Sequence, residues 1–301
     1  MLVYGAILGD IIGSPYEFDR GEKTKEFELF PAHARFTDDT VMTIAVAEAL
    51  MASGQTPNEA AVKADVVHFM QHWGRCYPRV GYGGLFRKWL VTDDPQPYGS
   101  FGNGAAMRVS SVGWLYSSFS LTQKVARWTA EVTHNHPEGI KGAEAVASAI
   151  YLARGGSSKA VIRQYISGQY GYDFSRSLKA IRPHYRMDAT CQGSVPEAIT
   201  AFFESTSMVD AIRGAVSLGG DTDTTACIAG SIAEGFYGCP DDLHEECVKR
   251  IPADMREVLF AFDMMREERR GGELCWREER PLNSFYSVIR RNSVHSRKKK
   301  K

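Results

Sequence analysis

Apolar residues recur along most of this chain at the spacing of an α-helix, and this pattern constrains the fold more than any other feature. Residues 40–52 (TVMTIAVAEALMA) are apolar nearly all round, which indicates a helix buried in the core. Alternating patterns typical of strands are scarce, and no run of evenly spaced hairpin signals appears. We therefore predict an all-α fold.

Further segments show the same helical spacing and are separated by glycine-rich connections. No change of composition marks a linker before about residue 285. We predict one compact domain over residues 1–288 and a flexible basic tail over residues 289–301. The predicted helices, besides 40–52 and an apolar first helix within 1–12, cover residues 58–73, 121–133, 139–153, 157–169, 195–204, 208–218, 222–236 and 253–270.

The charge distribution excludes one class of function. The 301 residues contain 36 basic and 36 acidic residues, a formal net charge of zero. The last twelve residues hold seven of the basic residues and no acid, so the rest of the chain carries 29 basic and 36 acidic groups, a net of −7. A body of that sign lacks the basic face that nucleic-acid binding requires, so we expect no specific nucleic-acid partner.

Three further patterns in the sequence bear on membrane association and on the cellular compartment of the protein. No stretch of 18 or more uncharged apolar residues exists, which argues against a membrane partner. The apolar start lacks a basic leader and contains Asp10, unlike a signal peptide. The six cysteines are scattered without a CxxC pair, which favours reduced thiols over disulfides or a zinc site. We predict a cytoplasmic protein, and we expect a monomer.

Two short strings each place two aspartates and neighbouring threonines at the start of a predicted core helix. Residues 36–42 (FTDDTVM) open the helix at 40–52, and residues 219–226 (GGDTDTTA) open the helix at 222–236. Helix capping explains one aspartate or threonine at each position. Capping does not require two aspartates per helix, and crowding carboxylates at the end of a buried helix is costly without a compensating cation.

These residues favour a metal site over simple capping. Four carboxylates with nearby hydroxyl oxygens form a hard, all-oxygen ligand set without histidine or cysteine. Such a set suits Mg²⁺, Mn²⁺ or Ca²⁺ better than zinc. The glycines at 219–220 would let the backbone turn sharply into the site.

Six motifs, taken together and in order, carry a family resemblance. The chain resembles the ADP-ribosylglycohydrolase family, and the matching region extends over residues 5–235, most of the predicted domain. Any one of these strings alone is weak, whereas six in order are specific. The motifs are residues 5–17 (GAILGDIIGSPYE), 36–40 (FTDDT), 81–83 (GYG), 102–108 (GNGAAMR), 133–134 (TH) and 219–224 (GGDTDT).

The resemblance implies a fold and a cofactor. The implied fold is a compact all-α orthogonal bundle, in agreement with the helical pattern. The implied cofactor is two divalent cations, Mg²⁺ with Mn²⁺ as the alternative, in a cleft among helix ends. Asp10 is expected to be a satisfied buried acid and not a direct ligand. By motif match, the implied metal ligands are Thr37, Asp38, Asp39, Asp221, Asp223 and Thr224.

The resemblance also implies residues that contact the substrate. Glu17 would gate the site or contact a metal; the alternative is an exposed loop carboxylate. Ser100, Phe101, Gly102, Asn103 and Gly104 would approach ADP-ribose, with backbone amides donating to phosphate oxygens. Stacking of Phe101 on adenine and simple packing both stay open.

Three further positions complete the implied site. His134 matches the family histidine near the nucleotide. Residues 81–83 are expected to form a pocket wall. Arg108 is expected to form a structural ion pair in preference to binding phosphate.

The implied function is divalent-metal-dependent hydrolysis of the bond between ADP-ribose and a modified protein side chain, with arginine as the first candidate. Asp39 or Asp223 would orient and deprotonate water, with Glu17 as a further catalytic residue, through an oxocarbenium-like transition state. The partner would be an ADP-ribosylated protein or ADP-ribose conjugate. The alternatives are O-linked substrates (ADP-ribosylserine or O-acetyl-ADP-ribose) and a non-catalytic nucleotide-binding protein.

Overall fold

A computed structural model of the chain describes residues 3–54 and 56–270. Helices make up the regular structure of these residues, and their one sheet-like pairing is an isolated bridge between Gly102 and Thr190. The all-α prediction is therefore confirmed. The elements are α1 (Tyr4–Gly13), η1 (Ser14–Tyr16), α2 (Asp38–Ala52), α3 (Glu59–Cys76), α4 (Gly84–Val91), α5 (Gly104–Met107), α6 (Ser110–Leu115), α7 (Phe119–Glu131), α8 (Pro137–Arg154), α9 (Lys159–Tyr170), α10 (Leu178–Ile181), α11 (Cys191–Glu204), α12 (Met208–Val216), α13 (Thr222–Tyr237), α14 (Asp241–Arg250) and α15 (Ala253–Arg270).

Every helix predicted from periodicity is present, with ends that differ by a few residues. The pattern missed α14 because this helix is mostly polar and buries only Leu243 and Cys247. It also missed the short helices α4, α5, α6 and α10, which are too brief to show several helical periods.

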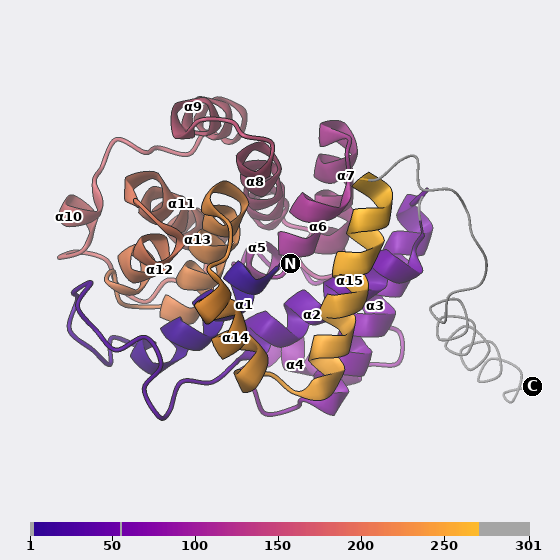
Figure 1. The fold of residues 1–301 in the computed structure, drawn as a ribbon. Helices are drawn as coiled ribbons and strands as arrows, with labels where there is room; N and C mark the ends of the chain where they lie inside the picture. Colours follow the sequence, from indigo (N-terminus) through magenta and orange to yellow (C-terminus); the bar gives the residue numbers. More distant parts are fainter. Residues whose placement is uncertain (1–2, 55, 271–301) are drawn as a thin grey trace, which may run out of the picture. The chain divides into compact units, whose positions relative to one another are not determined.

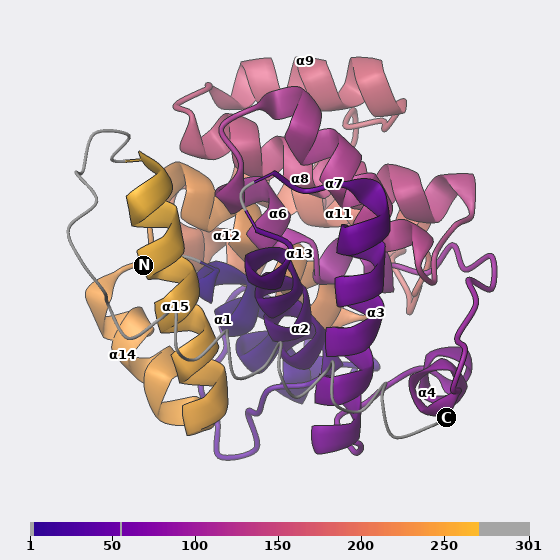
Figure 2. The same cartoon turned by 90° about the vertical axis from the view of Figure 1, so that its right-hand side faces the viewer.

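Helix α13 lies at the centre of the body. It packs against α1, α8, α11 and α12, and α2 packs against α3 (Figures 1 and 2). Nearly every residue of α13 and α2 is buried, including Asp39 of α2 and Asp223 of α13 near their N-terminal ends. The two helices that open with the acidic strings are therefore both core helices, as the sequence predicted.

Glycines allow α1 to approach α13 closely. Gly5, Gly9 and Gly13 lie four residues apart on α1, and each meets the backbone of α13. A Cβ atom built on Gly9 would lie 2.1 Å from the carbonyl oxygen of Ala226, which no real side chain tolerates. The close approach places Asp10, and Glu17 just beyond η1, beside the N-terminal end of α13.

The chain divides into two units, residues 1–264 and residues 265–301. Of the second unit, the structure describes only the last turns of α15, so the predicted domain end at residue 288 and the predicted tail over 289–301 lie outside the described residues. Within the described residues, no helix is both long enough and apolar enough to span a membrane.

Candidate active site

The N-terminal ends of α2 and α13 meet in the core. The hydroxyl group of Thr224 donates a hydrogen bond to Oδ2 of Asp39 at 3.3 Å, which joins the two acidic strings. Asp39, Asp221 and Asp223 are at most 5% exposed, whereas Asp38 is half-buried. The tertiary structure therefore brings together residues that are about 180 positions apart in sequence.

Asp10 holds the start of α2 in place. Its carboxylate accepts hydrogen bonds from the backbone amide and the hydroxyl of Thr37, at 2.8 and 2.7 Å. It also accepts from the backbone amide and the hydroxyl of Thr40, at 3.0 and 2.5 Å. Both oxygens of this fully buried carboxylate are thus satisfied, in agreement with the expectation that Asp10 is a buried structural acid.

Capping accounts for Thr37 in the first acidic string but not for the aspartate at the N-cap position of the second. The Thr37 hydroxyl caps α2 by accepting from the amide of Asp39 at 3.4 Å. Asp221 occupies the N-cap position of α13, yet its side chain makes no capping hydrogen bond. Instead, Oδ2 of Asp221 accepts from the side-chain amide of Asn103 at 2.7 Å. Capping alone therefore leaves Asp38 and Asp221 unexplained.

Glu17 joins the acidic cluster from the loop that follows η1. One carboxylate oxygen from each of Glu17, Asp221 and Asp223 lies within 4.8 Å of the others, so these residues could hold a metal ion together. Asp38 and Asp39 are not part of this mutually close set. Glu17 is half-buried, and this placement differs from that of a freely exposed loop carboxylate.

The residues after Glu17 are fixed to the turn that precedes Asp221. The amide of Phe18 donates to the carbonyl of Gly220 at 2.8 Å, and the amide of Gly220 donates to Oδ1 of Asp19 at 3.0 Å. Phe18 and Asp19 both have positive φ angles, 61° and 55°, which is unusual for residues other than glycine. The surrounding contacts therefore hold a strained backbone next to the cluster.

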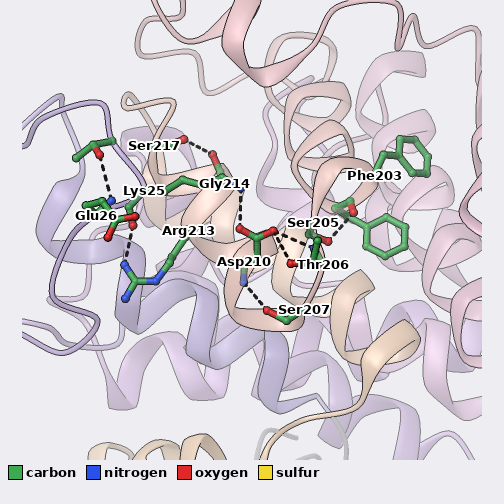
Figure 3. A network of polar contacts seen from close by, with 12 residues as sticks. Lys25, Glu26, Phe203, Ser205, Thr206, Ser207, Asp210, Arg213, Gly214 and Ser217 are labelled. Atoms are coloured by element: carbon green, nitrogen blue, oxygen red, sulfur yellow. Dashed lines mark hydrogen bonds and ion pairs between the residues drawn. The ribbon is translucent and has the colours of Figure 1, made fainter.

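Further along, the same loop is fastened to α12. Nζ of Lys25 forms an ion pair with Asp210 at 2.7 Å. The guanidinium group of Arg213 donates to the carbonyl of Lys25 at 2.7 Å (Figure 3). It also donates to the carbonyl of Phe27 at 2.8 Å. These contacts anchor the loop between Glu17 and α2 at a position outside the acidic cluster.

The cluster concentrates negative charge without a neutralising partner. No lysine, arginine or histidine among residues 3–54 and 56–267 forms an ion pair with its carboxylates within 4.0 Å. Burial and then neighbouring carboxylates raise the pKa of Asp38 to about 8 and the pKa values of Asp39 and Asp223 well above their usual range. The same causes raise the pKa of Glu17 to about 7.

The loop of residues 100–104 lies against the acidic cluster through Asn103. The side-chain amide of Asn103 bonds Asp221 and also donates to Oγ of Ser194 at 3.2 Å. The backbone amide of Asn103 donates to the carbonyl of Ala189, and the carbonyl of Phe101 accepts from the amide of Cys191. The hydroxyl of Ser100 accepts from the amide of Gly102 at 3.1 Å.

Phe101, His134 and the 81–83 segment, all predicted to belong to the site, lie in different surroundings. The Phe101 ring is 45% exposed and lies 5.3 Å from the ring of His136. His134 is buried directly beside Gly104, with 3.1 Å between its Nε2 atom and a Cβ built on that glycine. Gly81 lies against the carboxylate of Asp38, which places the 81–83 segment beside the cluster.

The expectation for Arg108 was wrong in one respect. Arg108 is structural and buried, but it forms no ion pair with the carboxylates of the described chain. Its guanidinium group instead donates to the carbonyls of Gly104 and Thr129 and to the hydroxyl of Thr133. A neutral environment of oxygen acceptors, and not a carboxylate, therefore surrounds this buried cation.

Comparison with known proteins identifies the family. The sequence model of the ADP-ribosylglycohydrolase family matches residues 2–272. The chain belongs to the ADP-ribosylglycohydrolase family. It is therefore an enzyme, an ADP-ribosylglycohydrolase, and the cluster at the ends of α2 and α13 is its candidate active site.

The sequences of relatives within the ADP-ribosylglycohydrolase family align with most of this chain. The ADP-ribosylhydrolase ARH3 of Bos taurus is 30% identical, over 81% of this chain and 86% of the relative. The ADP-ribosylarginine hydrolase Tri1 of Pseudomonas putida is 25% identical, over 78% of this chain and 69% of the relative. A solved structure, an ADP-ribosylglycohydrolase-related protein complex, shares the fold with a TM-score of 0.64 at 22% identity, over 87% of this chain and 96% of that chain.

Sequence reasoning missed two contacts that shape the site. Asn103 was expected to approach the substrate, and no pattern indicated that its side chain binds Asp221. Asp19 was not singled out, although it holds the turn before Asp221. The strand-like or helical spacing of a segment gives no signal for contacts between two loops that are distant in sequence.

Proposed function

We propose that this ADP-ribosylglycohydrolase cleaves the glycosidic bond between ADP-ribose and a modified protein side chain, with arginine as the preferred linkage. One observation carries the proposal: the hydrogen bond from Asn103 to Asp221 joins the glycine-rich 100–104 loop to a buried group of carboxylates. A loop that can bind phosphate thereby lies next to groups that can hold cations and activate water.

The residues present fit a pair of divalent cations. Oδ1 of Asp39 is buried and has no hydrogen-bond partner among the described residues, and Asp221 and Asp223 are buried beside Glu17. Oxygen ligands of this kind suit Mg²⁺, with Mn²⁺ as the alternative. In the proposal the ligands are Thr37, Asp38, Asp39, Asp221, Asp223 and Thr224, with Glu17 at the same cluster.

The side chains of the site have separate roles in the proposed reaction. When bound, divalent cations supply Lewis acidity, which stabilises developing charge as the glycosidic bond breaks. Asp39 or Asp223 accepts the proton of the attacking water at a carboxylate oxygen, as a general base. The 100–104 loop binds the nucleotide through backbone amides, and Glu17, half-buried at the cluster, contacts the sugar or the leaving group.

The proposed cofactor gives a stability prediction. Mg²⁺ at millimolar concentration should raise the Tm of the metal-free protein, because a ligand that binds only the folded state stabilises it by an amount that grows with the logarithm of its concentration over Kd. At 100 times Kd the gain is about 2.7 kcal/mol. A thermal melt with and without Mg²⁺ measures this. Asp221→Asn should remove most of the shift, and an equal shift in this variant would contradict the proposed ligand set.

The preference for arginine rests on charge. A guanidinium group is cationic and pairs well with carboxylates, and Glu17 is the carboxylate of the cluster that remains once the four aspartates bind two divalent cations. A serine linkage offers no such charge. The relative Tri1 is named an ADP-ribosylarginine hydrolase, which is in line with this choice.

Incubation of the purified protein and Mg²⁺ with matched peptides tests the linkage. We expect release of ADP-ribose from arginine-linked peptide at least about tenfold faster than from serine-linked peptide, since each 1.4 kcal/mol of added charge pairing gives a factor of ten. O-acetyl-ADP-ribose serves as the third substrate. Release from the serine-linked peptide alone would rule out arginine, and release from none of the three substrates would contradict the proposed function.

A further inference from the structure

Arg108 is a buried cation whose partners are all neutral. It is 1% exposed, and its guanidinium group donates to the carbonyl of Gly104 at 2.9 Å and to the carbonyl of Thr129 at 3.1 Å. It also donates to the hydroxyl oxygen of Thr133 at 2.9 Å. Because an arginine side chain carries donors and no acceptor, the Thr133 oxygen must act as the acceptor in this contact.

The hydroxyl hydrogen of Thr133 then has one hydrogen-bond acceptor available. Nδ1 of His134 lies 2.6 Å from the Thr133 oxygen, and the described residues offer this buried hydroxyl no other acceptor within hydrogen-bond distance. If Nδ1 carried the ring proton instead, the hydroxyl hydrogen would be buried without a partner, which is unfavourable. The favoured arrangement is therefore Arg108 donating to Thr133, and Thr133 donating to Nδ1 of His134.

This arrangement fixes the state of the His134 ring. A neutral histidine that accepts at Nδ1 carries its proton on Nε2. Burial, and then the positive charge of Arg108, lower the pKa of His134 well below its usual range, so the ring stays neutral near pH 7. Nε2 lies beside the nucleotide loop: Cβ atoms built on Gly104 and Gly102 would be 3.1 and 3.5 Å from it.

We propose that Thr133 and Arg108 are positioning residues that hold His134 as an Nε2–H donor toward the diphosphate of ADP-ribose on the 100–104 loop. This inference rests on the proposed function, because the loop must bind the nucleotide. Arg108 adds positive charge directly behind the same loop, 4.0 Å from a Cβ built on Gly104, which favours an anionic ligand.

Thr133→Val is the first test, because valine has the shape of threonine without the hydroxyl group. We expect the Kd for ADP-ribose and the KM for an ADP-ribosyl peptide each to rise about tenfold, as for loss of a hydrogen bond to a charged group. We expect kcat to change less than about threefold, because the acidic cluster is untouched. Thr133→Ser, which restores the hydroxyl, should recover most of the affinity.

Thr129→Val is the matched control. Thr129 is also fully buried, four residues earlier, but its hydroxyl donates only to the carbonyl of Ala126. This variant should bind ADP-ribose as the unmodified protein does, within about twofold. Equal affinities for Thr133→Val and Thr129→Val would overturn the proposal.

The tautomer of His134 is the second readout and needs no variant. Nitrogen-15 NMR of the imidazole should show a neutral ring protonated at Nε2 from about pH 6 to 8. A ring protonated at Nδ1, or an imidazolium at pH 7, would overturn the proposal even if Thr133→Val failed to fold. If ADP-ribose binds but no substrate is hydrolysed, the proposed function fails and the positioning role stands.

Discussion

Replacing Asp39 by asparagine is expected to lower kcat/KM for an ADP-ribosyl substrate by about 10³-fold or more. The substitution keeps the shape of the side chain but removes a charge that the proposal assigns both to cation binding and to water activation. The carboxylate is 2% exposed, and its Oδ1 atom lacks a hydrogen-bond partner among the described residues, so the chain offers no substitute for it. Steady-state kinetics at saturating Mg²⁺ measures the loss.

A stability measurement separates loss of function from loss of fold. Burial and neighbouring carboxylates raise the pKa of Asp39 well above its usual range, so its charged form destabilises the metal-free protein. Asp39→Asn should therefore melt at the same or a higher temperature in EDTA. Glu197→Gln is the matched control, a buried acid paired with Arg176 at 2.6 Å outside the cluster. Turnover by Asp39→Asn within tenfold of the unmodified enzyme would refute the assigned role.

Gly9→Ala is expected to have the largest effect on stability, a loss of about 3 kcal/mol or more in the free energy of unfolding. The added methyl group would lie 2.1 Å from the carbonyl oxygen and 2.4 Å from the carbonyl carbon of Ala226. Both atoms belong to the backbone of a buried helix, so α1 and α13 must separate to relieve the clash. For a chain of this length the Tm should fall by roughly 6–12 °C.

The matched control is Gly168→Ala on α9. A Cβ atom built on Gly168 meets nothing within 4 Å, so alanine should leave stability unchanged or raise it by up to about 1 kcal/mol. Chemical denaturation of both variants tests the comparison. If Gly9→Ala were as stable as Gly168→Ala, the close contact between α1 and α13 would not exist in solution.

The fold class could be read from the sequence because helix burial leaves a local signature. Residues 40–52 and 222–236 are apolar on nearly every side, and both correspond to core helices. Helix α14 was not predicted from the sequence because only two of its side chains are buried. A surface helix with few buried residues shows weak hydrophobic periodicity.

The residues of the site were partly predictable for a similar reason. Paired aspartates at the start of an apolar helix conflict with the cost of burying charge, and that conflict marked both acidic strings. The contacts that arrange them were not predictable. Asn103 reaches Asp221 over 118 positions, and Thr37 reaches Asp10 over 27 positions.

The sequence by itself therefore determined the helical class, the family and which carboxylates conflict with their buried surroundings, because each depends on residues that are near one another along the chain. Only the tertiary structure decided that Glu17 lies with Asp221 and Asp223, that Arg108 has neutral partners, and that hydrogen bonds of Thr133 connect Arg108 with His134. Side-chain hydrogen bonds depend on positions fixed within a fraction of an ångström, which packing of distant segments sets and local spacing does not.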